Sequence, residues 1–317
     1  MKKLFAIGET LIDFIPQNTG VGIAQVEAFA PHVGGAPANV CAAYHKLGGP
    51  SAMITQLGDD PFGDKIQNLL ADTGIDTSYV RRTGEATTSL AFVALKEDGN
   101  REFSFFRKPG ADMLYKPEYL QKDWFADGFA LHYCSVDLGN FPMKDAHRTA
   151  IEYARKCGLL ISFDPNLRFN LWDDLGALKE AVLEFMPKSD IVKISDEELE
   201  FITGHTDIES ALPVLFAGNT KLVIYTEGAA GARAYTRDAA AHHVAAPVKA
   251  IDTTGAGDAF IGAFLHQLAR DGVNSQNIGE LSCRKLREYL EFCNRYCGMS
   301  VQKNGAISSY PTLQEMA

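Results

Sequence analysis

Short apolar runs alternate with amphipathic stretches along most of the chain. A continuous apolar run bounded by turn residues is typical of a strand that is buried on both faces of a sheet. Such runs predict strands over residues 4–8, 52–57, 130–136, 159–163, 191–194, 222–225 and 248–251. Apolar residues at helical spacing predict helices over residues 34–46, 61–70, 142–156, 195–199, 260–268 and 286–299. This alternation predicts an α/β fold with a mainly parallel, doubly wound sheet that is flanked by helices.

One part of the chain departs from this rhythm, because its apolar residues recur with a period of two. Residues 89–95 and 101–107 are rich in β-formers, and the turn sequence Glu97-Asp98-Gly99-Asn100 lies between them. We therefore expect a hairpin. Together with a strand over residues 21–29, it would form a small sheet apart from the main one.

The domain organisation follows from the lack of any long linker between these elements. We expect a single domain over residues 1–317, with the small sheet inserted from about 14–33 and 87–112. A sheet of so few strands is marginal alone and has exposed edges. Pairing with a second copy of the chain would cover those edges.

Composition narrows the class of function. A net charge of −10 over 317 residues argues against a nucleic-acid partner, which requires a basic face. No run approaches the ~18 apolar residues of a membrane span. Met1-Lys2-Lys3 resembles the start of a signal peptide, but Glu9 and Asp13 interrupt the apolar run that follows, so we expect a cytoplasmic protein. The six cysteines include no CxxC pair, and we expect ordinary buried thiols.

The strongest chemical signal is the stretch Asp252-Thr253-Thr254-Gly255-Ala256-Gly257-Asp258-Ala259-Phe260, which leads into a predicted helix. Its glycines allow a tight turn, and the free N–H groups of Gly255, Ala256 and Gly257 would form an anion site at the helix N-terminus. Asp258 follows at once. It either caps the helix or takes a proton from a substrate hydroxyl while the amides hold a transferring phosphoryl group.

This stretch resembles the second signature of the ribokinase-like (PfkB) sugar kinases, and Gly34-Gly35-Ala36-Pro37-Ala38-Asn39-Val40 resembles the first. The resemblance covers nearly the whole chain, and Phe105–Asp112 and Ile191–Leu199 are most similar to bacterial fructokinases within the family. It implies a ribokinase-like fold in which the small sheet is a lid over the sugar. In many relatives that sheet also forms the interface of a homodimer.

On the sugar side, the resemblance implies contacts from five residues. Asp13 follows the first strand, where the family has an Asp that binds sugar hydroxyls; the alternative is a solvated turn aspartate. Gly34 and Gly35 allow close approach to the sugar and are not a phosphate loop, because no Lys-Ser/Thr follows at Walker spacing. The amide of Asn39 offers hydroxyls both a donor and an acceptor. Arg107, which leaves the hairpin, either contacts the sugar or is a surface charge.

On the phosphate side, Arg168 follows the strand at 159–163. It would meet the phosphoryl group or a substrate oxyanion, or else form a salt bridge with Asp164. Ser195 and Glu198 have the spacing of a capping box. In the family the matching Glu helps to position Mg²⁺ through water, usually with Asn in place of Ser195, so cap and metal roles compete for Glu198.

The resemblance implies further groups for ATP and for a monovalent cation such as K⁺. The nucleotide contacts would be Lys193, Thr226, Gly228, Gly231 and Asn294. The cation site would comprise Asp252, Thr254, Ser300, Lys303, Gly305 and Ser309. Nothing in the spacing of these residues indicates an ion by itself.

The hypothesis from the sequence is an ATP-dependent sugar kinase, most similar to fructokinase, that transfers the γ-phosphoryl of ATP to the 6-hydroxyl of fructose. Alternatives within the family are kinases of 2-keto-3-deoxygluconate, ribose or a nucleoside. A non-catalytic sugar or nucleotide sensor is a further alternative, against which the intact Gly255–Asp258 sequence argues. A nicotinamide dehydrogenase is disfavoured, because Gly8-Glu9-Thr10 lacks the G-x-G-x-x-G pattern.

Overall fold

The computed structural model of the chain describes residues 1–18, 20–95 and 101–317. Within these residues, the main sheet has the strand order β13-β12-β11-β10-β9-β8-β1-β4-β5. All neighbours from β11 to β5 in this order pair in parallel, and β12 and β13 extend the sheet in antiparallel fashion. The strands are β1 (Lys3–Ile7), β4 (Ser51–Gly58), β5 (Val80–Thr83), β8 (Gly128–Cys134), β9 (Leu160–Asp164), β10 (Ile191–Ser195), β11 (Leu222–Thr226), β12 (Ala232–Tyr235) and β13 (Ala240–His243).

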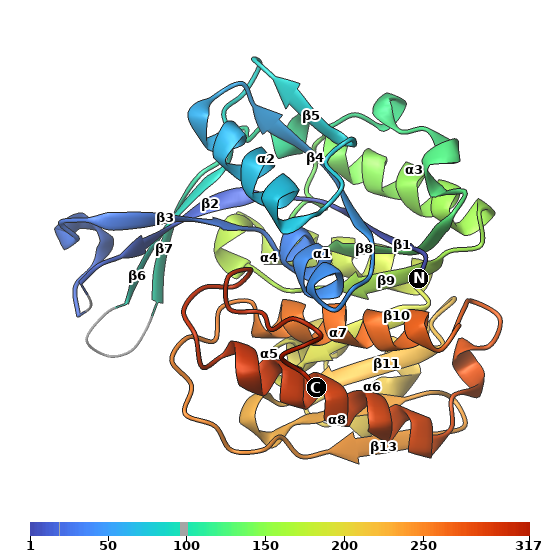
Figure 1. The fold of residues 1–317 in the computed structure, drawn as a ribbon. Helices are drawn as coiled ribbons and strands as arrows, with labels where there is room; N and C mark the ends of the chain where they lie inside the picture. Colours follow the sequence, from blue (N-terminus) through green and yellow to red (C-terminus); the bar gives the residue numbers. More distant parts are fainter. Residues whose placement is uncertain (19, 96–100) are drawn as a thin grey trace.

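Helices cover both faces of this sheet (Figure 1). One face carries α1 (Ala36–Lys46), α2 (Pro61–Thr73), α7 (Ala256–Arg270) and α8 (Cys283–Ser300). The other carries α3 (Pro142–Lys156), α4 (Leu175–Phe185), α5 (Asp196–Thr203) and α6 (Ile208–Leu215). Successive strand residues serve opposite layers; for example, Leu4 of β1 lies in the first core and Phe5 in the second. The predicted doubly wound α/β arrangement is confirmed.

Short 3₁₀ segments complete the connections. They are η1 (Ile23–Gln25), η2 (Asp112–Leu114), η3 (Pro117–Tyr119), η4 (Lys122–Phe125), η5 (Phe169–Leu171), η6 (Met186–Lys188), η7 (Gly228–Ala230) and η8 (Ile278–Glu280). None of the helices in the part of the chain that the structure describes is long and apolar enough to cross a membrane.

A second, smaller sheet projects from the main body (Figure 1) and has the strand order β3-β2-β6-β7. Its strands are β2 (Leu11–Pro16), β3 (Phe29–Gly34), β6 (Leu90–Leu95) and β7 (Arg101–Phe106). The antiparallel β6–β7 pair confirms the expected hairpin, whose predicted turn Glu97-Asp98-Gly99-Asn100 lies outside the described residues. The strand predicted over residues 21–29 is wrong. Most of that segment lies outside any strand and contains η1, and only its last residue, Phe29, pairs with β2 as the start of β3.

The strand predicted over residues 248–251 is also wrong. Val248 and Ile251 are 43% and 61% exposed, and no strand covers them. The amides of Ile251 and Asp252 donate to the carbonyl of Val301 at 2.7 and 3.1 Å, so the C-terminal end of α8 holds this segment instead of a neighbouring strand. Among the cysteines, all six are free thiols, but Cys283 is exposed and was not expected to be.

Candidate active site

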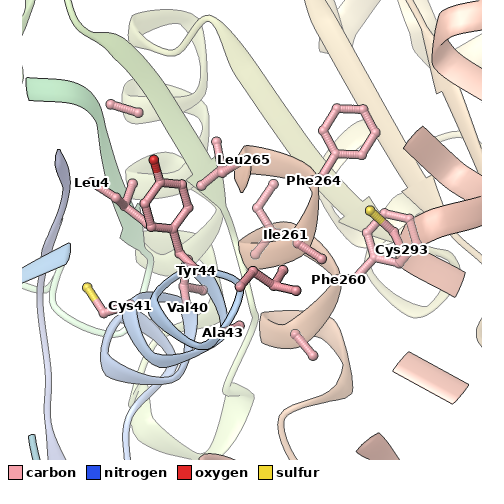
Figure 2. Close-up of a cluster of buried hydrophobic side chains, with 14 of the residues drawn as sticks. Leu4, Val40, Cys41, Ala43, Tyr44, Phe260, Ile261, Phe264, Leu265 and Cys293 are labelled. Atoms are coloured by element: carbon pink, nitrogen blue, oxygen red, sulfur yellow. The ribbon is translucent and has the colours of Figure 1, made fainter. Parts of the chain in front are cut away.

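The site is built on a close contact between α1 and α7. Figure 2 shows the apolar side chains of the two helices together, among them Val40 and Tyr44 of α1 and Ile261 of α7. A Cβ on Gly262 would lie 2.6 Å from the Cβ of Ala43, so only glycine allows this separation. The contact therefore places the first turns of both helices side by side at the carboxyl edge of the sheet, where ligands of open α/β sheets bind.

Two amide side chains hold the carboxylate of Asp258 at this edge. Asn39 Nδ2 of α1 donates to Asp258 Oδ2 at 2.8 Å, and Asn166 Nδ2, after β9, donates to Oδ1 at 3.4 Å. Asp258 is 7% exposed. Burial raises its pKa above the ordinary range, while Asn39, Arg168 and Lys193 act to lower it. A buried carboxylate with a raised pKa is suited to accept a proton.

The turn before α7 depends on Gly255. This residue is left-handed (φ +73°), and a Cβ there would lie 2.5 Å from the hydroxyl oxygen of Tyr310. The Tyr310 hydroxyl donates to the carbonyl of Gly255 at 2.9 Å and fixes the turn. No side chain larger than hydrogen fits here without moving the C-terminal segment.

Amides without a helical acceptor are present at the N-terminus of α7, with one difference from the prediction. The amide of Ala256 donates to the carbonyl of Thr253 at 3.2 Å, so it does not point outward as predicted. Ala259 makes the first helical bond, which leaves the amides of Gly257 and Asp258 without an acceptor inside the helix. These two amides and the helix dipole favour an anion at this point.

Lys193 adds a positive charge next to Gly257, whose amide is one of these two. Its Nζ lies 3.0 Å from the position that a Cβ on Gly257 would occupy, and it pairs with Asp164 Oδ2 at 2.9 Å. Burial raises the pKa of Asp164 to about 7, although Lys193 acts to lower it. The predicted alternative of an Arg168–Asp164 salt bridge is wrong, because Lys193 takes that place.

Arg168 is an exposed side chain that faces the same space. Its Nη1 donates to the carbonyls of Leu167 and Asn166 at 3.0 and 3.4 Å. Its positive charge lowers the pKa of both Asp13 and Asp258. These electrostatic effects place the charge of Arg168 close to both carboxylates, where a substrate anion could also meet it.

Asp13 lies within β2 and not in a turn, so the solvated-turn alternative is wrong. Burial raises its pKa to about 6; Arg168 lowers it and Asp258 raises it. A Cβ on Gly34 would lie 2.1 Å from Asp13 Oδ2, and Gly35 (φ +108°) passes so close to the segment between β1 and β2 that a Cβ would lie 2.6 Å from the carbonyl oxygen of Glu9. The two glycines therefore leave room for the Asp13 carboxylate opposite Asp258.

Two polar atoms are buried near the carboxylates of Asp13 and Asp258. Among the described residues, Asn39 Oδ1 and Thr10 Oγ1 are buried and have no hydrogen-bond partner. A buried polar atom without a partner costs about 1–3 kcal/mol. Such atoms beside the two carboxylates fit a ligand that carries hydroxyl groups.

Glu198 has both carboxylate oxygens engaged. Oε2 accepts from the amide and the hydroxyl of Ser195, each at 2.9 Å, and Oε1 accepts from the amide of Leu167 at 2.7 Å. The predicted capping box is confirmed. Its metal role stays a prediction; in the described ranges, no three His, Cys, Asp or Glu side chains form a group that could hold a metal.

Apart from Lys193 of β10, the residues expected at the nucleotide lie at the end of β11 or later in the chain. Thr226 ends that strand, Gly228 begins η7, and Gly231 (φ +105°) passes within 2.2 Å, at its Cβ position, of the carbonyl oxygen of His243. Asn294 Nδ2 of α8 donates to the same carbonyl at 2.9 Å. Glycine and asparagine thus join β13, α8 and the loop after β11 into one wall.

Asp252 links the turn before α7 to a loop near the C-terminus. Its Oδ1 accepts from the amide and the hydroxyl of Thr254 at 2.9 and 2.6 Å, and its Oδ2 accepts from the amide of Gly305 at 2.9 Å. Other residues of the expected cation site have local contacts: Ser300 with Cys297, Lys303 with Glu315 and Ser309 with Ala306. Thr254 and Gly305 are thus brought to the carboxylate of Asp252, and the cation role of the group stays a prediction.

Arg107 is buried, so the alternative of a surface charge is wrong. Its Nε and Nη2 donate to Asp112 Oδ2 at 3.1 and 2.5 Å, and Nη2 also pairs with Asp137 Oδ1. A direct sugar contact was predicted for this residue, but its Nε and Nη2 already face carboxylates.

The similarity of this chain to known proteins extends over almost its whole length. Residues 1–313 match the pfkB family carbohydrate kinases. The chain belongs to that family. It is 41% identical over 310 residues to probable fructokinase-5 of Arabidopsis thaliana, covering 98% of this chain and 94% of the relative. It is 41% identical over 315 residues to fructokinase-1 of Zea mays, covering 98% and 95%.

Solved structures of the family have the same fold. Fructokinase with bound ATP from Xylella fastidiosa superposes with a TM-score of 0.90 at 31% identity, over 99% of this chain and 96% of that one. Fructokinase from Vibrio cholerae O395 with fructose, ADP and calcium gives 0.88 at 32% identity, over 100% and 98%. The ribokinase-like fold that the PfkB signatures implied is confirmed.

One residue of this kinase site was missed by the sequence analysis. Asn166 has φ +45°, a left-handed conformation that non-glycine residues seldom adopt, and its side chain contacts Asp258. Asparagine tolerates this conformation better than other residues with a Cβ. The signal was the Asp164-Pro165-Asn166 turn sequence, which indicates a turn without indicating its partner.

Proposed function

We propose that this member of the pfkB family is an ATP-dependent fructokinase that transfers the γ-phosphoryl of ATP to the 6-hydroxyl of fructose. The observation that carries the proposal is the Asp258 carboxylate, held by Asn39 at the N-terminus of α7 and opposite Asp13. The names of the relatives support the acceptor, and neighbours solved with ATP, or with fructose and ADP, support the two substrates.

The sugar would lie between the two carboxylates. Asp13 and Asn39 Oδ1 would accept hydrogen bonds from its hydroxyls, with the backbone of Gly34 and Gly35 alongside. Asp258 would take the proton of the 6-hydroxyl as the phosphoryl group arrives. This arrangement uses the buried Asn39 Oδ1, which has no hydrogen-bond partner within the described part of the chain.

The transferring phosphoryl group would lie over the N-terminus of α7. The amides of Gly257 and Asp258 would hold its charge, with Gly255 and Ala256 shaping the turn, and Arg168 would approach from the opposite side. One donor of this kind contributes about 2.7–4 kcal/mol to the transition state. Positioning and electrostatics supply most of the rate enhancement in phosphoryl transfer.

ATP would lie along the wall formed by Thr226, Gly228, Gly231 and Asn294, with Lys193 at the phosphate end. Mg²⁺ is expected with ATP, and the donor set fits an ion held mainly by phosphate oxygens and water, with Glu198 bound through water. When bound, it would neutralise phosphate charge. The oxygen-rich loop around Asp252 fits K⁺.

The proposal includes an assembly and a place in the cell. A cytoplasmic enzyme of one domain over residues 1–317, with its lid from about 14–33 and 87–112, would dimerise through that lid. Phe106 on β7 is 61% exposed, which supports a covered surface there. Sedimentation equilibrium tests this, and a monomer in the presence of sugar and ATP would contradict it.

An acceptor panel with ATP tests the substrate. Fructose, ribose, a nucleoside and 2-keto-3-deoxygluconate would be compared by kcat/KM, and fructose is expected to lead. The acid sugar requires a cation for its carboxylate, and Arg107 is already paired with Asp112 and Asp137. Turnover of the ketodeoxy acid alone would overturn fructose, and binding without turnover of any acceptor would support the sensor.

A further inference from the structure

The chain passes between the two sheets at four places, and each of them contributes to one buried polar cluster. The passages run from β1 to β2, from β3 to α1, from β5 to β6, and from β7 to η2. We call the group the junction cluster; its members are Glu9, Ala36 (through its amide), Ser89, Arg107, Asp112 and Asp137.

Arg107 stands at the centre of the junction cluster. It connects Asp112, which follows β7, with Asp137, which follows β8 of the main sheet. Asp112 Oδ1 in turn accepts from the hydroxyl of Ser89 at 2.5 Å, at the start of β6. One guanidinium thus ties both ends of the small-sheet hairpin to the main sheet.

Glu9 brings the other two passages to the same place. It lies between β1 and β2, and its Oε1 accepts from the amide of Ala36, the first residue of α1 after β3, at 3.1 Å. Burial raises the pKa of Glu9 to about 7, Arg107 acts to lower it, and Asp112 acts to raise it. The charges of the cluster are therefore close enough to act on one another.

The charge count makes Arg107 the essential member. Three buried carboxylates, those of Glu9, Asp112 and Asp137, surround a single guanidinium, and Asp137 Oδ2 has no hydrogen-bond partner among the described residues. Removal of one partner from a buried ion cluster leaves like charges unopposed. Without Arg107 these carboxylates would lose the cation that they share and would repel one another or take up protons, and in either case the link between the two sheets would be lost.

From this arrangement we propose that Arg107 is a positioning residue. It fixes the small sheet at the angle that holds Asp13 of β2 opposite Asp258 of α7, and it does so through Asp112 and Asp137 without touching the sugar. The proposal rests on the proposed function in that Asp13 is taken to bind the sugar. The short distance along the chain from Glu9 to Asp13 makes the position of Asp13 depend on this cluster.

The test compares Arg107→Met, Arg107→Lys and Asp137→Ala with the wild type. For Arg107→Met we expect KM for fructose to rise about 10-fold or more while KM for ATP changes by less than about 2-fold. Arg107→Lys, which keeps the charge but not the fork, should fall between it and the wild type. Asp137→Ala should raise KM for fructose in the same way, and the double variant should be no worse than Arg107→Met alone.

Hydrogen exchange gives a readout that requires no activity. Amides of β2 and β6 should lose protection in Arg107→Met and Asp137→Ala, while those of β8 and β9 remain protected. Arg148→Met is the matched control, because Arg148 forms surface ion pairs with Asp145 and Glu184 away from the small sheet. It should change neither the exchange of β2 nor KM for fructose.

Several results would overturn the proposal. If Asp137→Ala leaves KM and exchange unchanged while Arg107→Met raises KM, Arg107 touches the sugar directly. If the two substitutions have additive effects, they do not act through one cluster. Should Arg107→Met not fold, Arg107→Lys and Asp137→Ala carry the same test. Failure of the wild type to phosphorylate fructose would refute the proposed function alone, and the exchange measurement would still decide the positioning role.

Discussion

Substitution of Asn166 tests whether the neighbours of Asp258, the proposed catalytic base, set its pKa. Substitution to glycine removes the amide that contacts Asp258 and relieves the left-handed backbone at φ +45°. A non-glycine residue in this region costs on the order of 1 kcal/mol, and glycine costs about 0.5–1 kcal/mol in the unfolded chain. These effects oppose each other, so we expect the free energy of unfolding of Asn166→Gly to change by less than about 1 kcal/mol.

Activity should respond differently. A hydrogen bond to a charged group contributes about 1.5–3 kcal/mol, and a length of 3.4 Å favours the lower end of that range. A loss of about 1.5 kcal/mol corresponds to about a 10-fold fall in kcat/KM. Because the lost bond stabilised the charged carboxylate, the pKa of Asp258 should rise further, and the acid limb of the pH–rate profile should move to higher pH.

The assay is ADP release measured across pH, together with thermal unfolding of the same samples. Asn166→Asp is the second variant; it keeps a residue that tolerates the left-handed conformation but places a like charge beside Asp258, so its acid limb should move further. Wild-type kcat/KM and an unmoved acid limb in Asn166→Gly would refute the reasoning, since the side chain would then serve only the turn.

Three further outcomes follow from the same geometry. Asp258→Asn should lose kcat by about 100-fold or more while ATP still binds, as measured by calorimetry, and equal turnover would remove it as the base. Gly262→Ala should cost about 1–3 kcal/mol in urea unfolding, because its Cβ would lie 2.6 Å from that of Ala43; an unchanged midpoint would contradict the close contact. Asp13 has a pKa raised to about 6, so KM for fructose should increase as pH falls below about 6, and Asp13→Asn should abolish that dependence. Because the folded pKa of Asp13 lies above the unfolded value, its contribution to stability should be complete below about pH 4 and lost as pH rises through about 6.

Local pattern predicted the main sheet and its helices well, because each buried strand is a separate apolar run. The helix predicted over residues 61–70, for example, is α2, and it ends at Gly74 in the left-handed conformation. The same logic failed at residues 248–251, where an apolar run is exposed and bonded to α8. It also failed at residues 21–29, where η1 lies in the connection between the paired strands β2 and β3. The apolar pattern of a sequence predicts which residues are buried. That prediction fails where the fold exposes apolar residues or buries charged ones.

In the candidate site, too, single residues were predicted from the sequence but their partners were not. Asp258 and Asn39 were predicted from their own motifs, but their hydrogen bond joins residues 219 positions apart, and no periodicity encodes it. The pairing of Lys193 with Asp164, and of Arg107 with Asp137, depends on which strands become neighbours in the sheet. Motifs therefore identified the chemical groups, while the partners that tune them appeared only in the fold.

The tuning has a physical logic that connects stability with catalysis. Burial of a carboxylate disfavours its charged form, and this cost is offset at Asp258 by two amides and by the positive charges of Lys193 and Arg168. The compensation is incomplete, since the pKa remains raised. A fully compensated carboxylate would be a weak base, and an uncompensated one would be protonated and inert. The partial balance leaves a carboxylate that binds a proton more tightly than a free aspartate does, which is what removal of a hydroxyl proton during phosphoryl transfer requires.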